Sequence, residues 1–281
     1  MSGEQKRSKT GDTAETSDTI TNNKTKWSRW CKKFWWTFGG LVVAVMVVSL
    51  SFVAEPDCAA YKATGHMASG VYTLGSTPAL AGVEVYCDMK PGGGWTVIQR
   101  RLDGSVFFNR TWEEYKHGFG NKNGEYWLGN ENIHRLTTQK DYILRIDMMD
   151  WDGNKRYAEY NTFRVSGESE QYRLTISGYS GTAGDTITDS YSIKRGGSWQ
   201  TSGQMFSTVD RDNDGHIFRS CSQRYGQGGG WYRNGCGGAK LNGRYLGNCG
   251  NSCPHAQGVT WYDWRGHSYS LKSVSMKIRP R

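Results

Sequence analysis

The chain has 281 residues, with 35 Lys and Arg against 26 Asp and Glu, and a formal net charge of +9. Its 37 glycines and its aromatic content of 13% argue against a helical bundle and favour a loop-rich fold built on short strands. The positive charge forms no basic stripe, so we expect no nucleic-acid partner.

Two segments precede the region that contains most of the cysteines and all of the predicted strands and short helices. Residues 1–33 are polar and without periodicity, which predicts a disordered cytoplasmic tail. Residues 34–54 carry no charged side chain, and a helix of this length spans roughly 30 Å, the thickness of a hydrocarbon core. Basic residues precede this run and acidic residues follow it. The positive-inside rule therefore predicts a single-pass type II membrane protein with an extracellular region over 55–281. Cleavage of the apolar run, which would give a secreted protein, is the alternative.

Six of the seven cysteines lie in the predicted extracellular region. An even number of cysteines in an oxidising compartment predicts disulfides, although six cysteines allow many pairings. A zinc cluster is a weaker alternative, because no pair has Cys-x-x-Cys spacing. The order along the chain favours the pairs Cys58–Cys87, Cys221–Cys236 and Cys249–Cys253.

Asn109 begins a glycosylation sequon that ends at Thr111 and would face the outside of the cell. Asn23 begins a second sequon, which the predicted topology places in the cytoplasm. We therefore expect a glycan at Asn109 alone.

Short strands and helices alternate in the extracellular region. Apolar alternation between turn residues predicts strands at 70–74, 83–87, 94–100, 141–149, 157–165 and 171–177. The helix-starting residues Thr111 and Asn130 predict helices over 111–117 and 130–138. The fold class expected is α+β, with a mainly antiparallel sheet, preceded by one transmembrane helix.

Three carboxylates alternate at Asp210, Asp212 and Asp214, and Gly215 follows them. Oxygen-rich loops of this kind suit Ca²⁺, a hard cation with about six to eight oxygen ligands. An EF-hand is excluded, because Cys221 stands where that loop needs a bidentate Glu. The spacing alone leaves a Ca²⁺ site and a solvated acidic turn as equal alternatives.

The outer region resembles the fibrinogen C-terminal domain family, which includes ficolins, tachylectins and a membrane-anchored, chitin-binding protein. The stretches that carry the resemblance are SGVYTL at 69–74, VYCDM at 85–89, GGGWTVIQRRLDGSVFFNRTWEEYKHGFG at 92–120, EYWLGNENIHRLT at 125–137, LRIDMMDWDGNKRYAEYNTFRV at 144–165, YRLTISGYSGTAGD at 172–185, LNGRYL at 241–246, WYDW at 261–264 and YSLKSVSMKIRP at 269–280. It covers roughly residues 56–281. It implies an N-terminal disulfide subdomain, a central sheet with helices, and a loop-rich C-terminal subdomain that holds Ca²⁺ and a ligand pocket.

The resemblance assigns the Ca²⁺ ligands. They would be the carboxylates of Asp212 and Asp214 and the backbone carbonyls of His216 and Phe218. Asp210 would support this set without contacting the ion.

The resemblance also implies a pocket for an acetyl group beside the Ca²⁺ site, where aromatic rings would pack on the methyl group and the sugar face. The candidate walls are Tyr225, Tyr232, Tyr245 and Trp261, His255 replaces an aromatic residue of the family, and the pocket depends on a strained peptide between Gly235 and Cys236. The chain departs from the family pattern at Gly237, which replaces a His, and at Lys240, which replaces an Asn. His255 would either supply the missing imidazole or lie exposed in its loop.

These features predict a calcium-supported pattern-recognition lectin of innate immunity that binds acetylated glycans at the cell surface. The alternative is a protein-binding adhesion or signalling ligand without sugar binding. No HExxH or GxSxG motif occurs, so we expect no enzymatic activity. The partners expected are an acetylated carbohydrate or a cell-surface protein, the membrane through one helix, and a second copy of the chain in a homo-oligomer.

Overall fold

The structure, a computed structural model, describes residues 54–75, 78–188, 201–233 and 235–281. The chain divides into two units, Met1–Ser51 and Phe52–Arg281, and every described residue belongs to the second unit. The predicted tail at 1–33 and the predicted membrane span at 34–54, except Ala54, lie outside the described residues.

The second unit is built from short helices and strands joined by long connections. In chain order they are α2 (Cys58–Ala63), β1 (Gly70–Thr73), β2 (Glu84–Asp88), β3 (Trp95–Arg101), α3 (Trp112–His117), β4 (Phe119–Gly120), β5 (Tyr126–Trp127), α4 (Asn130–Thr137), β6 (Tyr142–Met149), β7 (Lys155–Val165), η1 (Glu168–Glu170), β8 (Leu174–Gly181), β9 (Phe206–Ser207), α6 (Cys221–Arg224), β10 (Gly230–Trp231), β11 (Ala239–Lys240), η2 (Gly250–Ser252), β12 (Thr260–Trp261), α7 (Tyr262–Arg265) and β13 (Ser273–Pro280). The predicted α+β class with a mainly antiparallel sheet and short helices describes this arrangement.

The described part of the chain does not contain the predicted transmembrane helix, and the predicted span lies outside that part except for Ala54. Within residues 54–281, as far as the structure describes them, no helix is both long and apolar enough to cross a bilayer. The transmembrane helix of the predicted fold class and the predicted type II membrane localisation are not carried further.

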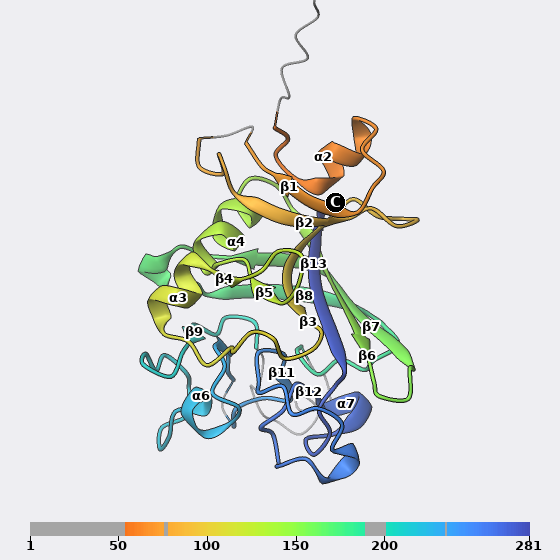
Figure 1. Ribbon diagram of the computed structural model, residues 1–281. Coiled ribbons are helices and arrows are strands. Elements are labelled where there is room, and N and C mark those ends of the chain that lie inside the picture. Colours follow the sequence, from red (N-terminus) through yellow and green to blue (C-terminus); the bar gives the residue numbers. More distant parts are fainter. Residues whose placement is uncertain (1–53, 76–77, 189–200, 234) are drawn as a thin grey trace, which may run out of the picture. The chain divides into compact units, whose positions relative to one another are not determined.

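One antiparallel sheet organises the unit (Figure 1). In the described residues it has nine strands, and its main path runs β1-β2-β3-β13-β6-β7-β8, with β4 and β5 added beside β3. The last strand of the chain, β13, pairs with β3 on one side and β6 on the other. Residues from the start, middle and end of the sequence therefore meet at the centre of the sheet.

The predicted strands and helices correspond to elements of this sheet and its flanking helices. Buried and half-buried residues alternate along β6, as the apolar alternation predicts. The helix α3 begins with the capping box that Thr111 and Glu114 indicate, in which each side chain accepts the other residue's backbone N–H. β13 was not predicted as a strand, because the positively charged Lys277 and Arg279 interrupt its apolar pattern.

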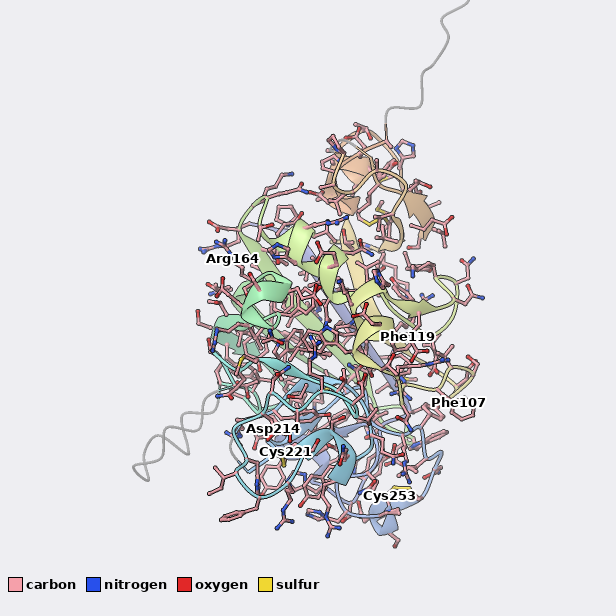
Figure 2. All side chains as sticks on the ribbon, turned by 90° about the vertical axis from the view of Figure 1, so that its left-hand side faces the viewer. Phe107, Phe119, Arg164, Asp214, Cys221 and Cys253 are labelled. Carbon is pink, nitrogen blue, oxygen red and sulfur yellow. A yellow bond between two sulfur atoms is a disulfide. The ribbon has the colours of Figure 1, made fainter. Side chains whose placement is uncertain are left out.

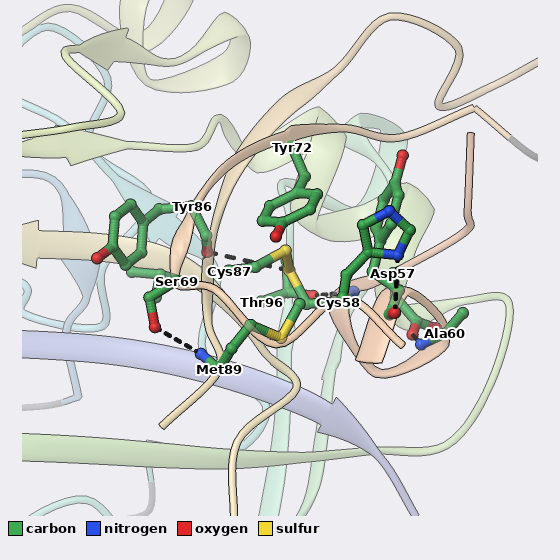
Figure 3. The surroundings of a disulfide bond; sticks show 12 residues. Asp57, Cys58, Ala60, Ser69, Tyr72, Tyr86, Cys87, Met89 and Thr96 are labelled. Atoms are coloured by element: carbon green, nitrogen blue, oxygen red, sulfur yellow. Dashed lines mark hydrogen bonds between the residues drawn. A yellow bond between two sulfur atoms is a disulfide. The ribbon is translucent and has the colours of Figure 1, made fainter. Parts of the chain in front are cut away.

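Three disulfides lie in the unit, and they are the pairs that the chain order favours: Cys58–Cys87, Cys221–Cys236 and Cys249–Cys253 (Figure 2). The Cys58–Cys87 bridge joins α2 to β2 (Figure 3). The Cys58 backbone N–H donates to Thr96 Oγ1 at 3.1 Å, and the Asp57 side chain caps α2 at Ala60. The first helix is therefore fixed to β2 and β3 by covalent and polar contacts together.

A buried ion pair connects the sheet to the loop-rich C-terminal part. Arg101, at the end of β3, has its Nε 3.7 Å from Glu125 Oε1, and both side chains are almost fully buried. Arg101 Nη1 donates to the carbonyl of Gly243 at 2.6 Å and to that of Leu241 at 3.3 Å. Glu125 accepts from four backbone N–H groups of the loop after β3: those of Leu102, Asp103, Gly104 and Val106.

Aromatic rings form a second connection between the same parts. Phe206 of β9 stacks on Trp127 of β5, with ring centroids 5.8 Å apart, and meets Trp231 of β10 edge-on at 5.1 Å. Tyr115 of α3 packs against both Trp127 and Phe206. The core is thus continuous from the sheet into the segment that precedes the Cys221–Cys236 bridge.

The substitution Glu125→Gln should destabilise the protein by about 3–5 kcal/mol, because it leaves the Arg101 guanidinium buried without a counter-charge. Denaturant unfolding of the full-length chain measures this change in the free energy of unfolding. The matched control is Glu113→Gln, which removes the same charge from a mostly exposed pair with His117 and should cost less than about 1 kcal/mol. Equal costs for the two variants would show that the buried pair has no special role.

Candidate functional site

The Cys221–Cys236 bridge is the centre of the candidate site. Both cysteines are buried, and Tyr232 and Tyr225 pack against them. The Tyr232 hydroxyl donates to the Gly228 carbonyl at 2.5 Å, which holds the ring inside the loop that the bridge closes. The bridge therefore has a rigid aromatic support on the side where the sequence predicts a pocket.

The acidic loop reaches this bridge through Asp214. Asp214 Oδ2 accepts from the Cys221 backbone N–H at 2.7 Å, and Oδ1 accepts from the His216 N–H at 2.8 Å. Figure 2 shows Asp214 and Cys221 close together. The Asp212 side chain accepts from the Asp214 N–H at 3.2 Å, so the two carboxylates share one turn of the loop. The geometry couples the loop directly to the start of α6.

Asp210 lies in a different environment. Its Oδ1 accepts from the Trp112 backbone N–H at 2.8 Å and from the Thr208 hydroxyl at 2.7 Å. Asp210 thus accepts the hydrogen bond of a backbone N–H in the first turn of α3. Within the described residues, no three His, Cys, Asp or Glu side chains converge as a metal cluster would require.

Two carboxylates with backbone carbonyls and water are a donor set that fits Ca²⁺. Burial raises the pKa of Asp214, and the like charge of Asp212 raises it further. A cation held between the two groups would remove this repulsion. The ring of Phe218 is exposed, and its N–H donates to His216 Nδ1 at 3.2 Å. The assignment of the His216 and Phe218 carbonyls to the ion stays a prediction.

The backbone before and after Cys236 is left-handed. Gly235, Cys236 and Gly237 have φ values of 78°, 68° and 64°. A non-glycine residue at positive φ is strained, and such strain persists only where the surroundings impose it. Here the Cys221 bridge and the hydrogen bond from the Cys236 N–H to the Arg233 carbonyl, at 2.8 Å, impose it.

Lys240 lies directly under this left-handed turn. Only 4% of the residue is exposed, and its Nζ donates to the carbonyls of Cys236 at 3.0 Å and Gly237 at 2.8 Å. The same ammonium lies 5.3 Å from the centre of the Tyr225 ring. Lys240 therefore replaces the neutral amide of the family pattern with a buried positive charge.

A set of rings continues from Lys240 to the surface. His255 lies 6.3 Å from Tyr225 and 4.9 Å from His267, measured between ring centroids, and His267 lies 4.6 Å from Tyr262. His255 and Tyr262 are exposed, and Tyr225 and His267 are half-buried. We call Tyr225, Lys240, His255, Tyr262 and His267 the basic aromatic cluster.

Positive charges act on both Lys240 and His267. Burial lowers the pKa of Lys240 to about 8, with a further contribution from Arg233. Burial also lowers the pKa of His267 to about 4, and the positive charges of Lys240, His255 and Arg233 add to this effect. His267 Nδ1 is buried and has no hydrogen-bond partner.

Two of the predicted wall residues have structural partners elsewhere. The Tyr245 hydroxyl lies within hydrogen-bond distance of the carbonyls of Leu102, at 2.8 Å, and Lys272, at 2.9 Å. Trp261 is fully buried, and its indole N–H donates to the carbonyls of Ala183 and Gly184, each at 3.1 Å. Among the described residues, neither ring makes a hydrogen bond or a ring contact with a side chain of the basic aromatic cluster. The cluster therefore combines three residues that the sequence singled out with Tyr262 and His267, which it did not.

Asn109 is exposed on the loop before α3, and its side-chain amide donates to Gln227 at 3.4 Å. The sequon is thus at an accessible position, and its glycosylation stays a prediction.

Ca²⁺ should raise the melting temperature of the full-length chain relative to chelator, because a ligand that binds only the folded state stabilises it by about 2.7 kcal/mol at a hundredfold excess over Kd. Asp212→Asn should remove most of this shift. The control Asp141→Asn deletes the same charge from an exposed position and should keep it. A wild-type melting temperature that does not respond to Ca²⁺ would identify the loop as an acidic turn. An undiminished shift in Asp212→Asn would place the ion elsewhere.

Comparison with known proteins finds relatives over most of the chain. Fibrinogen-like protein 1 of Bos taurus is 48% identical over 233 residues, which cover 80% of this chain and 72% of the relative. Angiopoietin-2 of Homo sapiens is 46% identical over 225 residues, which cover 80% of this chain and 42% of the relative.

Solved structures show the same fold. The fibrinogen-like globe domain of human ANGPTL2 has a TM-score of 0.71 and 44% identity, covering 80% of this chain and 99% of that chain. A lamprey fibrin D-dimer complexed with the peptide ligand Gly-His-Arg-Pro-amide has a TM-score of 0.73 and 36% identity, covering 92% of this chain and 83% of that chain.

These comparisons correct the predicted description of the chain as a membrane lectin of innate immunity. The relatives named above are a fibrinogen-like protein and an angiopoietin, and the lamprey structure is complexed with a peptide ligand. The Lys240 ammonium donates to the carbonyls of Cys236 and Gly237, next to the place where the resemblance implies an acetyl site.

The family model for the C-terminal globular domain of fibrinogen beta and gamma chains matches residues 54–281. The match includes the whole described sheet, the three disulfides and the loop-rich part with the acidic loop and the basic aromatic cluster. The chain therefore belongs to the fibrinogen C-terminal domain family.

Proposed function

We propose that this domain is a protein-binding adhesion or signalling ligand, which holds a segment of its partner at the basic aromatic cluster. The observation that carries the proposal is the combination of exposed and half-exposed rings with a rigid base. Tyr262 is 54% exposed and contacts His267, and the ring contacts continue through His255 to Tyr225, which packs against the disulfide. Tyrosine rings on a fixed backbone are typical of the residues that contribute most to protein–protein affinity.

The comparisons support this proposal over a sugar-binding one. The lamprey fibrin D-dimer, to which this chain is 36% identical, is complexed with a peptide ligand. In this chain, Cys236 and Gly237 direct their carbonyls to Lys240, so the backbone around the bridge is already held before a partner arrives. A preorganised site loses less conformational entropy when it binds.

The proposed function includes no reaction step. The acidic loop would act indirectly, because Asp214 accepts from the Cys221 N–H and so fixes one end of the bridge that supports the cluster. Ca²⁺, if bound there by Asp212 and Asp214, would hold this loop in place. The residues of the basic aromatic cluster would contact the partner.

Selection of a displayed library of random linear peptides on the purified full-length chain tests the proposal. The selected peptides should bind the wild-type protein and lose affinity at least about tenfold on Tyr262→Ala, because more than half of that residue is exposed. The control Phe107→Ala removes another exposed ring, on the loop before α3, and should leave their affinity unchanged. A library that yields no binder, or binders indifferent to Tyr262→Ala, would contradict the proposal.

A further inference from the structure

We propose that a groove on the open face of the central sheet binds an extended acidic segment of a partner protein. The groove lies over β2, β3, β13, β6 and β7, which follow one another in the sheet (Figure 1). We call it the sheet groove. It contains no residue of the basic aromatic cluster, so it would add a second contact site to the proposed protein-binding function.

Side-chain alternation along the strands forms the sheet groove. In β6, Ile146 belongs to the hydrophobic core and Arg145 lines the groove. In β13, Ile278 belongs to the core, whereas Lys277 and Arg279 line the groove. The groove has a volume of about 860 Å³, and ligand pockets usually have about 300–1,000 Å³. It is therefore large enough to hold a short peptide segment.

Basic side chains outnumber acidic ones in the sheet groove. Of the ten charged residues that line it, seven are basic and three are acidic. The three acidic side chains are all in ion pairs with Lys277 or Arg145. The remaining basic side chains have no ion pair with a described residue, and they are Lys90, Arg100, Lys155, Arg156 and Arg279. The groove therefore has an excess of positive charge, which favours an acidic ligand.

Four of these unpaired cations lie at the two ends of the groove. Arg279 Nη1 donates to the carbonyl of Gly92 at 2.7 Å, in the turn that begins at Lys90, so these two basic residues mark one end. Lys155 and Arg156 begin β7 and mark the other end. Lys90, Lys155 and Arg156 are exposed and Arg279 is half-buried, so a ligand can reach all four.

The strand register gives the separation of the two ends. Arg279 pairs with Ile143 of β6, and Lys155 of β7 pairs with Met149 of the same strand. The distance from Ile143 to Met149 along the strand is about 20 Å, at a rise of about 3.4 Å per residue. The ion pairs of Arg145 lie between these positions. The matching ligand therefore has acidic residues about six positions apart in an extended chain, with uncharged residues between them.

The middle of the groove favours a peptide over a uniformly charged polymer. Asp147 and Glu159 lie there, so the central sulfates of a sulfated polysaccharide would meet carboxylates. Ser275, which is opposite Asp147, also lines this part and carries a hydroxyl that can bond to a peptide group. An acidic peptide with an uncharged middle part fits this arrangement better.

Aromatic rings hold guanidinium groups of the groove in place. The guanidinium carbon lies 4.0 to 4.4 Å from a ring centre in three pairs, which are Arg145–Tyr157, Arg100–Tyr86 and Arg279–Trp95. Arg100 is buried, so it adds positive charge without touching the ligand. Arg279 is held by its ring and one carbonyl, and a guanidinium has five N–H donors, so it can still donate to a ligand. Side chains that are fixed before binding lose less conformational entropy.

Two N-acetylated and C-amidated peptides of the same composition test the proposal on the full-length chain. The spaced peptide, Glu-Glu-Ser-Ser-Ser-Ser-Glu-Glu, has carboxylates at both ends, and the central peptide, Ser-Ser-Glu-Glu-Glu-Glu-Ser-Ser, has them together. At an ionic strength of about 0.1 M the Debye length is about 10 Å, so the two ends of the groove act separately. The spaced peptide should bind at least about threefold more tightly, because only it reaches both ends.

The double variant Lys155→Gln with Arg156→Gln removes the charge from one end of the groove and should bind the two peptides alike. The control, Arg164→Gln with Arg219→Gln, removes two exposed positive charges outside the groove and should keep the preference. All four side chains are exposed, so both variants should fold.

Residues 1–33 are also rich in Lys and Arg, so the position of the bound peptide is measured as well. Mass spectrometry follows the acetylation of lysines with and without the spaced peptide. Lys90 and Lys155 should be protected by the peptide. Lys140, which is exposed and lies outside the groove, should react at an unchanged rate.

Equal affinity of the two peptides, or unprotected Lys90 and Lys155, would overturn the proposal. A heparin hexasaccharide that protects the same lysines more strongly than the spaced peptide would assign the groove to a sulfated polysaccharide instead. Loss of spaced-peptide binding on Tyr262→Ala would place that peptide at the basic aromatic cluster and also overturn the proposal. Because the spaced peptide tests only the sheet groove, its failure leaves the proposed function of the basic aromatic cluster standing.

Discussion

The buried pair of Arg101 and Glu125 is the contact on which the rest of the unit depends. Glu125 gathers four backbone N–H groups of the loop after β3, and Arg101 crosses from the sheet to the carbonyls of Leu241 and Gly243. The chain from Leu241 to Gly243 follows Lys240 immediately. The position of the candidate binding site is therefore set by the central sheet, through a side chain that no partner would touch.

Local sequence patterns predict the elements of this fold better than their arrangement. The alternation in 141–149 and the capping box of Thr111 and Glu114 depend on neighbouring residues, so they are visible in the sequence. The central place of β13 is not, because Lys277 is held inside the sheet by Asp88 and Asp147, which are distant in sequence. From the sequence alone, a charged residue in a strand predicts an exposed position, because the partners that allow its burial are not visible there.

The candidate site shows the same limit. The Asp spacing and the family resemblance draw attention to Asp212, Asp214 and the Cys221–Cys236 loop, and the structure places Asp214 against Cys221. The sequence also marks Lys240 as a departure from the family pattern. It gives no sign that Tyr262 and His267 complete a cluster with it, because that contact is made by α7 and the turn after it. One substitution of a neutral amide by Lys thus puts a buried ammonium against the carbonyls of Cys236 and Gly237.

The central claim is that the sheet holds the binding site in place through Arg101. Hydrogen exchange of the full-length chain and of Arg101→Met measures this directly, since exchange reports local opening segment by segment. The account predicts that backbone amides in 236–243 lose protection in Arg101→Met. Those of α2, which the Cys58–Cys87 bridge and Thr96 fix independently, should keep theirs. Unchanged exchange in 236–243, or an equal loss of protection in both segments, would contradict it.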